Sequence, residues 1–219
     1  MPILEPAQRS IQSLYNWYSD GDLFVNRRYQ RKLVWTHLEK QKLIESIQNQ
    51  YPIPAVLLAE RSGGGFEIID GLQRLYAIVS FIEDKFSTLD GRYFDTSHFT
   101  TVQTQVDEGK GEAAHGKKLS QKEVGSFLDY VLPITVMRDA SESEIDDVFQ
   151  RINTYGHRLS DQERRQAGVQ DDFTNAVREL STEVRSDVSR DVLPLSDMPS
   201  ISIDLPLMKH GYRVQADQT

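Results

Sequence analysis

The 219-residue chain has a formal net charge of −8 and contains no cysteine. These features exclude thiol catalysis, cysteine-based zinc sites and disulfides, and the acidic balance argues against a general nucleic-acid coat protein. The apolar runs are far shorter than the roughly 20 residues that a membrane-spanning helix needs, and the N-terminus shows no secretion-signal pattern. We therefore expect a soluble, cytoplasmic protein that does not enter the membrane.

Hydrophobic periodicity and turn signals predict both strands and helices in the first part of the chain. A helix over residues 7–19 is followed by a short strand, and Thr36 can cap the next helix. Two strands joined by a glycine-rich hairpin lead into a strongly amphipathic helix from Asp70 onward. The expected helices are 7–19, 37–48 and 70–86, and the expected strands are 23–25, 55–60, 66–69 and 131–137.

The remaining stretches are less regular. Residues 96–120 are polar and contain three glycines, so we interpret them as a mobile loop or an insertion. Further helices are expected at 143–153, 161–167 and about 171–185, before a proline-containing tail. We interpret residues 1–170 as one domain and residues 171–219 as a helical extension and tail, cut from a longer protein. The irregular mixture predicts an α+β fold, and the absence of GxGxxG and Walker motifs argues against the common nucleotide-binding folds.

The first motif is the box Asp70-Gly71-Leu72-Gln73-Arg74-Leu75, which follows a strand and opens a helix. The N-terminus of a helix carries unpaired N–H groups and a partial positive charge, which suit a phosphate. Gly71 would let the backbone approach a ligand, Arg74 could contact a phosphate oxygen, and Asp70 could hold a divalent cation. The alternative is that Asp70 and Gln73 form a capping box, in which each side chain binds the other's backbone N–H. On physical grounds alone, this capping role is favoured over ligand binding.

A basic segment precedes this box. Residues 26–42 contain six basic residues and a single acidic one. The basic residues are Arg27, Arg28, Arg31, Lys32, Lys40 and Lys42. Basic side chains beside aromatic ones can bind phosphate and stack on bases, so part of this segment is a candidate nucleic-acid-binding site. Its candidate residues are Tyr29, Gln30, Arg31 and Lys32. The equally open alternative is a surface strand with Trp35 in the core and Arg31 in an ordinary salt bridge.

The third motif runs from Phe149 to Gly156 on an expected helix that ends at this glycine. Arg151 and Asn153, close to that end, could reach into a phosphate-binding pocket. Ser160 and Glu163 are spaced as a second capping box, which favours a structural role for Glu163. The five histidines form no recognisable zinc-binding pattern.

In this order, the three motifs resemble the DGQQR-motif family found at the N-terminus of GmrSD-type modification-dependent restriction enzymes. Family members show YQR-x-x-x-W, then DGQQRL, then FxRxNxxG, and the resemblance covers about residues 10–170. It implies a fold related to ParB and sulfiredoxin and a role in bacterial defence against foreign DNA. It also implies hydrolysis of a nucleoside triphosphate that controls a nuclease domain in the same or a partner chain.

By this resemblance, Asp70, Gln73 and Arg74 form the catalytic or nucleotide-binding core, with Asp70 also a ligand of Mg²⁺. The other phosphate-binding candidates are Gly71, Arg31, Arg151 and Asn153. One departure is Leu72, which replaces the first glutamine of the DGQQR pattern and fits the apolar stripe of the helix. If the family needs that amide for chemistry, this chain would bind a nucleotide and hydrolyse it poorly.

Two functions therefore stay open at this point. The first is a Mg²⁺-dependent nucleoside triphosphatase, or a regulatory nucleotide-binding domain, that acts on a nuclease. The second is a non-catalytic, ParB-like module that binds DNA, including modified DNA, through the basic segment. A nuclease active site would need clustered acids, and Asp70 is the only acid that the motifs place clearly.

Overall fold

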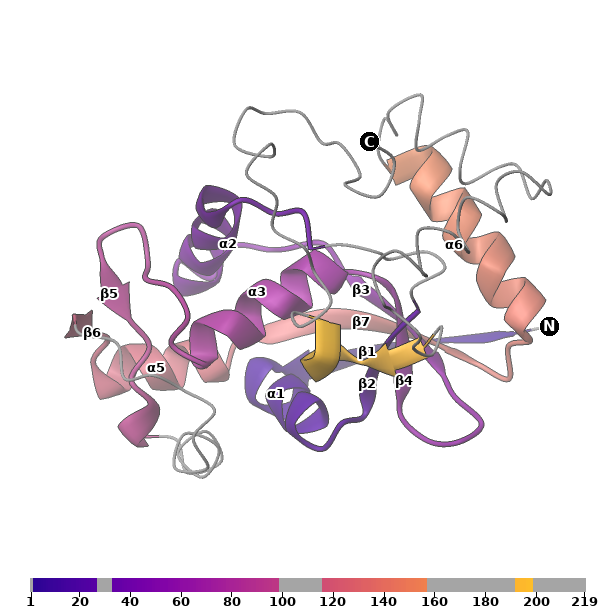
Figure 1. The fold of residues 1–219 in the computed structure, drawn as a ribbon, viewed down its shortest axis with the longest axis horizontal. Coiled ribbons are helices and arrows are strands. Elements are labelled where there is room, and N and C mark those ends of the chain that lie inside the picture. The colour runs from indigo at the N-terminus through magenta and orange to yellow at the C-terminus, as the bar shows by residue number, and fades with distance from the viewer. Residues whose placement is uncertain (1, 27–32, 99–115, 157–191, 199–219) are drawn as a thin grey trace, which may run out of the picture.

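The computed structural model describes residues 2–26, 33–98, 116–156 and 192–198, with only the backbone described at 98 and 153–156. A six-stranded mixed sheet forms the centre of the molecule, in the order β1-β7-β3-β4-β2-β8 (Figure 1). Its strands are β1 (Ile3–Ser10), β2 (Leu23–Asn26), β3 (Val56–Glu60), β4 (Phe66–Asp70), β7 (Val131–Arg138) and β8 (Val192–Pro194). The helices are α1 (Ile11–Ser19), α2 (His37–Gln48), α3 (Leu72–Ile82), α5 (Gln121–Leu128) and α6 (Glu142–Gly156).

The smaller elements are two 3₁₀ turns, η1 (Thr96–His98) and η3 (Leu195–Asp197), and the strands β5 (Arg92–Tyr93) and β6 (Lys117–Lys118), which pair with each other. In the main sheet, β3 runs parallel to β7 and β2 runs parallel to β4, whereas the other neighbouring pairs are antiparallel. This mixture confirms the predicted α+β class. The expected relationship to ParB and sulfiredoxin stays a prediction.

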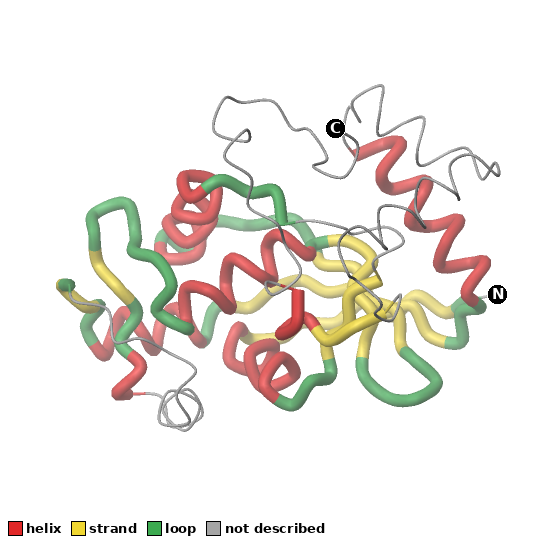
Figure 2. The backbone as a smooth tube through the Cα atoms, in the orientation of Figure 1, coloured by secondary structure: helices red, strands yellow, loops and turns green. Residues whose placement is uncertain are grey.

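The two faces of the sheet are covered unequally. Neighbouring β4 residues Ile68 and Ile69 belong to different apolar clusters, because successive side chains of a strand point to opposite faces. The larger cluster includes residues of α1, α2, α3 and α5, and the smaller one packs against partly buried residues of α6. Figure 2 shows α6 set apart from the other helices. The main core therefore lies on one face, and α6 covers part of the other.

Aromatic rings join α3 to α5 at one end of the main core. The Phe81 ring centroid lies 5.7 Å from that of Phe94 and 5.3 Å from that of Phe127. All three side chains are fully buried. This packing fixes the end of α3 that is remote from Asp70.

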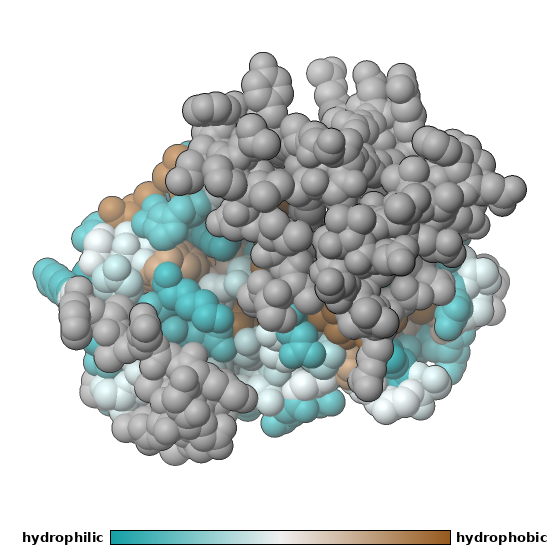
Figure 3. Space-filling model, in the orientation of Figure 1, coloured by the Kyte–Doolittle hydropathy of each residue, from teal (hydrophilic) through white to brown (hydrophobic). Residues whose placement is uncertain are grey.

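The described surface is largely hydrophilic on the face shown in Figure 3, with hydrophobic colour in small separate areas. Large exposed apolar side chains are spread over several elements, from Ile3 and Leu4 in β1 to Leu89 after α3. Among the described helices, none is long and apolar enough to cross a membrane.

Local signals located the starts of α2 and α6 to within one residue. Thr36 caps α2 as predicted, and its side chain and that of Glu39 form a reciprocal capping box. A second capping box, between Ser120 and Glu123, opens α5. The strand predictions at 23–25, 55–60, 66–69 and 131–137 agree with β2, β3, β4 and β7 to within one residue at each end.

Other expectations were wrong. The helix predicted over residues 7–19 begins at Ile11, because residues 3–10 pair with β7 as an edge strand and Ser10 provides the N-cap. Neither α5 nor β8 was predicted, and the stretch 96–120 contains η1 and β6 in its described parts. The helices expected at 161–167 and 171–185, the pair Ser160–Glu163 and the boundary at 170 lie outside the described residues. Pairing with distant strands, which local periodicity does not record, accounts for β1 and β8.

Glu123 provides a test of the packing between β5 and α5. Its carboxylate accepts hydrogen bonds from the Ser120 N–H and hydroxyl and from Arg92, and these contacts lower its pKa from 4.5 to about 2. Because the pKa is lower in the folded state, the stabilisation is present above about pH 4.5 and is lost as the pH falls towards 2.

We therefore expect Glu123→Gln to unfold at lower urea concentration than the wild type at neutral pH. The gap should be modest, since the side chain is 40% exposed, and it should close as the pH approaches 2. Urea titrations of both proteins across this range measure it. A gap that does not change with pH would contradict the assignment of the stabilisation to the ionised carboxylate.

Candidate functional site

The candidate site is the junction between β4 and α3. β4 ends at Asp70, and Gly71 follows with a φ of 101°, in the left-handed region that favours glycine. A Cβ on Gly71 would lie 2.9 Å from Cγ2 of Val56. Both the backbone angle and the contact with β3 therefore require glycine at this turn.

A shift in the β3–β4 pairing precedes the turn. Leu58 lies opposite Ile68, but Leu57 lies opposite Asp70, so the register changes between them. Such bulges bend a strand and change the direction of the side chains that follow. Asp70 is therefore the last paired residue of β4 and stands directly at the start of α3.

The start of α3 differs from those of α1, α2 and α5. Ser10, Thr36 and Ser120 each accept a hydrogen bond from the N–H of the residue three positions later. The N-cap of α3 is Gly71, which provides no side-chain cap. The capping box expected between Asp70 and Gln73 is therefore wrong: β4 continues through Asp70, the helix begins later, and both side chains have other partners.

Asp70 is held by the arginine one turn further along. A terminal nitrogen of Arg74 lies 2.7 Å from Oδ2 of Asp70 and donates a second bond, of 3.1 Å, to the carbonyl of Ala55. The Arg74 side chain is 15% exposed and that of Asp70 is 45% exposed. Nε of Arg74 is buried without a hydrogen-bond partner among the described residues. Arg74 thus fixes the orientation of a carboxylate that solvent can reach.

Gln73 makes a contact that no local pattern predicts. Its Oε1 accepts hydrogen bonds from the backbone N–H groups of Val34 (3.0 Å) and Trp35 (3.3 Å). This part of the basic segment is thereby attached to the first turn of α3. Trp35 is partly buried and packs against the main core, which agrees with the structural alternative for this residue.

The other predicted residues are placed less completely. Leu72 is buried in the main core, as its place in the apolar stripe predicted. Arg151 is exposed on α6, where its Nε lies 2.9 Å from Asp147. Asn153 belongs to α6, but its side chain is not described. The candidate nucleic-acid-binding residues Tyr29, Gln30, Arg31 and Lys32 lie outside the described residues. The structure thus brings together Asp70, Gly71, Gln73 and Arg74 and leaves the other candidates as predictions.

The metal chemistry of the junction depends on Asp70. In the described part of the chain, no group of three or more acidic or histidine side chains could hold a metal ion. A single exposed carboxylate nevertheless fits Mg²⁺, which proteins commonly bind through one or two carboxylates together with phosphate oxygens and water. The donor set present therefore suits an ion that arrives with a nucleotide better than a permanently bound one.

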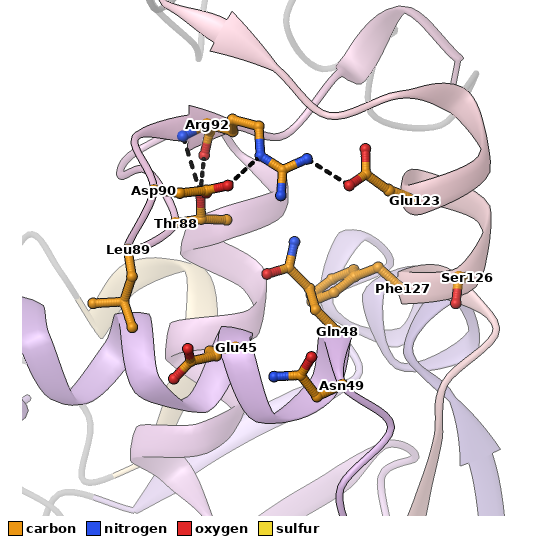
Figure 4. Close-up of a pocket in the computed structure, with 10 residues that line it drawn as sticks. All are labelled: Glu45, Gln48, Asn49, Thr88, Leu89, Asp90, Arg92, Glu123, Ser126 and Phe127. Atoms are coloured by element: carbon orange, nitrogen blue, oxygen red, sulfur yellow. Dashed lines mark hydrogen bonds and ion pairs between the residues drawn. The ribbon is translucent and has the colours of Figure 1, made fainter.

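A cavity that the sequence did not predict lies away from this junction. Its volume is about 360 Å³, and it lies between α2, the segment after α3, and α5 (Figure 4). Among the described residues, Arg92 is the only cationic side chain that lines it, and Asp90 (2.7 Å) and Glu123 (2.5 Å) both pair with that guanidinium. Because two carboxylates already neutralise Arg92, the cavity is poorly suited to a phosphate.

The fold and the junction together define an α+β domain in which a single glycine joins a strand to a helix. Comparison with protein families identifies it further: residues 11–169 match the model described as GmrSD restriction endonuclease, N-terminal domain. The chain belongs to this family, which makes it a component of a restriction system. No curated protein and no solved structure matches it.

The turn at Gly71 can be tested directly. In Gly71→Ala, the left-handed backbone and the contact with Val56 should together lower the free energy of unfolding by about 2 kcal/mol or more. Gly63→Ala is the matched control, because a Cβ there meets open space and its φ lies outside the left-handed region. Denaturant unfolding should place the control within about 0.5 kcal/mol of the wild type. Equal losses in the two variants would show that the turn does not need glycine.

Proposed function

We propose that this domain binds and hydrolyses a nucleoside triphosphate with Mg²⁺ and thereby regulates the nuclease of a restriction system. The observation that carries the proposal is the exposed Asp70 carboxylate, held by Arg74, directly before a helix whose N-cap glycine provides no side-chain cap. Membership in the GmrSD N-terminal family supports the restriction role.

Each residue of the junction would have a separate role in binding the nucleotide. The N–H groups at the start of α3 would donate hydrogen bonds to a phosphate, and Gly71 permits the left-handed turn that leads into this helix. Asp70 would hold Mg²⁺, which would supply positive charge to the phosphate oxygens. Arg74 keeps the carboxylate in place through its bonds to Asp70 and to the Ala55 carbonyl. Its near burial favours a positioning role over direct contact with the phosphate.

The proposal extends to two macromolecular partners. Six basic residues concentrate in residues 26–42 of an otherwise acidic chain, so we assign DNA binding to this segment. The nuclease that the nucleotide regulates would be a domain of the same chain or of a partner chain. The DNA that this segment binds would include modified DNA.

A second candidate function is supported by Leu72. This residue replaces the first glutamine of the DGQQR pattern, and its side chain is only 4% exposed, within the main core. No amide is therefore available from this position. Under this candidate, the domain is a ParB-like module that binds DNA without turning over a nucleotide.

Phosphate release from ATP, GTP, CTP and UTP with Mg²⁺, with and without DNA, tests the proposal. Asp70→Asn should lower turnover by about 100-fold, because loss of the carboxylate removes roughly 3 kcal/mol of charge stabilisation. Asp90→Asn in the remote cavity is the matched acid-to-amide control and should retain activity. Thermal unfolding of each variant separates loss of activity from loss of fold.

Turnover by Asp70→Asn equal to that of the wild type would contradict the proposed site. No turnover by the wild type, combined with DNA binding that weakens steeply with salt, would favour the second candidate.

A further inference from the structure

Two arginines differ from the others in the part of the chain that the structure describes. Most of the described arginines form ion pairs with carboxylates: Arg74, Arg92, Arg138 and Arg151. The exceptions are Arg9 in β1 and Arg61 directly after β3, which pair with no acidic side chain among the described residues. Arg9 is exposed and Arg61 is partly exposed. Because no carboxylate neutralises them, these two guanidiniums can attract an anion more strongly than the paired ones.

Both unpaired guanidiniums lie over aromatic rings. Cζ of Arg9 lies 5.7 Å from the centroid of the Trp17 ring, and Cζ of Arg61 lies 4.0 Å from that of the Phe24 ring. A guanidinium is attracted to the face of an aromatic ring, and its N–H groups point outward in its own plane. The rings therefore hold both arginines in place and leave their positive charge available.

The two stacked pairs are connected around the start of β4. The centroid of the Trp17 ring lies 4.6 Å from that of Phe66, the first residue of β4. Gly65 precedes it, and a Cβ on Gly65 would lie only 2.7 Å from the Phe24 ring. Phe66 lies opposite Leu23 in the β2–β4 pairing, so the Phe24 side chain points to the other face of the sheet. The two pairs thus lie on either side of one end of the sheet.

We propose that Arg9 and Arg61 contact the phosphodiester backbone of DNA at this end of the sheet. The planar fork of a guanidinium matches the oxygens of a phosphate. The rings beneath the arginines are already stacked, so they offer little surface to a base, and the contact carries no sequence information. This surface includes neither the Asp70 junction nor residues 26–42. The choice of DNA rests on the DNA binding proposed above, but not on nucleotide hydrolysis.

Acidic residues border this surface and limit its affinity. Asp20 and Asp22 belong to the turn between α1 and β2, and Glu60, which pairs with Arg138, directly precedes Arg61. Their carboxylates repel phosphate. The two arginines therefore add to a larger DNA-binding site and do not form a complete one.

Titration of a fluorescently labelled DNA duplex, followed by anisotropy at about 50 to 200 mM salt, tests the contact. Arg9→Gln and Arg61→Gln should each lower the affinity about fivefold at about 100 mM salt. Each should also reduce the slope of log K against log salt by about 0.9, because one phosphate contact is lost. The losses should be the same for duplexes of unrelated sequence, since a backbone contact does not depend on the bases.

Two kinds of control accompany these variants. Arg9→Lys and Arg61→Lys keep the positive charge and should keep the salt slope of the wild type. Lys122→Gln removes one positive charge from α5, which lies far from the β3–β4 hairpin in Figure 1, and should leave the slope unchanged. Thermal unfolding checks the fold of each variant. Phosphate release without DNA should be equal in all of them, because none of the changes touches the Asp70 junction.

An unchanged salt slope in both glutamine variants would overturn the proposal, even if the affinity fell, because the arginines would then support the fold without meeting a phosphate. A wild-type protein that binds no DNA would overturn it as well, and an acidic protein partner would then fit this surface better. A wild-type protein that hydrolyses no nucleotide would defeat the proposed triphosphatase, whereas the salt slopes would still decide the contact with DNA.

Discussion

The arrangement of the candidate site depends on the left-handed turn at Gly71. Because β4 stays paired as far as Asp70, the chain must leave the sheet and enter α3 within a single residue. Only a residue without a Cβ fits so close to Val56 at a φ of 101°. The turn puts an acidic side chain at the end of a strand and a helix N-terminus next to it. Every other contact of the junction follows from this placement.

The same turn frees two polar side chains from capping. In a helix that began one residue earlier, Asp70 and Gln73 would satisfy each other's backbone, and the junction would be a closed structural cap. With Gly71 as the N-cap, the Asp70 carboxylate pairs with Arg74 and the Gln73 oxygen reaches the backbone of residues 34 and 35. A one-residue change in where the helix begins therefore decides whether Asp70 caps the helix or presents its carboxylate to solvent.

The sequence predicted what short-range forces determine. The apolar stripe of α3 and the Thr36 cap depend on residues within one or two turns, and both were predicted correctly. β1 and β8 exist because of pairing with β7 and β2, far away in the chain, and their own residues show no clear alternation. The motifs identified Asp70, Gly71, Gln73 and Arg74 as a group. They could not show that Gln73 contacts a backbone 39 residues away or that Asn26 meets Glu67 across 41 residues. The Asn26–Glu67 contact follows from the parallel pairing of β2 with β4, which no local pattern encodes.

The charges of the described residues limit how this acidic domain could hold a nucleotide. Arg74 pairs with Asp70, Arg92 with Asp90 and Glu123, Arg138 with Glu5 and Glu60, and Arg151 with Asp147. Each of these guanidiniums is at least partly neutralised, so none supplies a full positive charge to a phosphate. At the junction itself, positive charge would come from the N-terminus of α3 and from a cation on Asp70. A helix terminus contributes only about half a charge, against the several negative charges of a triphosphate. A nucleotide site at this junction would therefore need the cation on Asp70 in addition to the helix terminus.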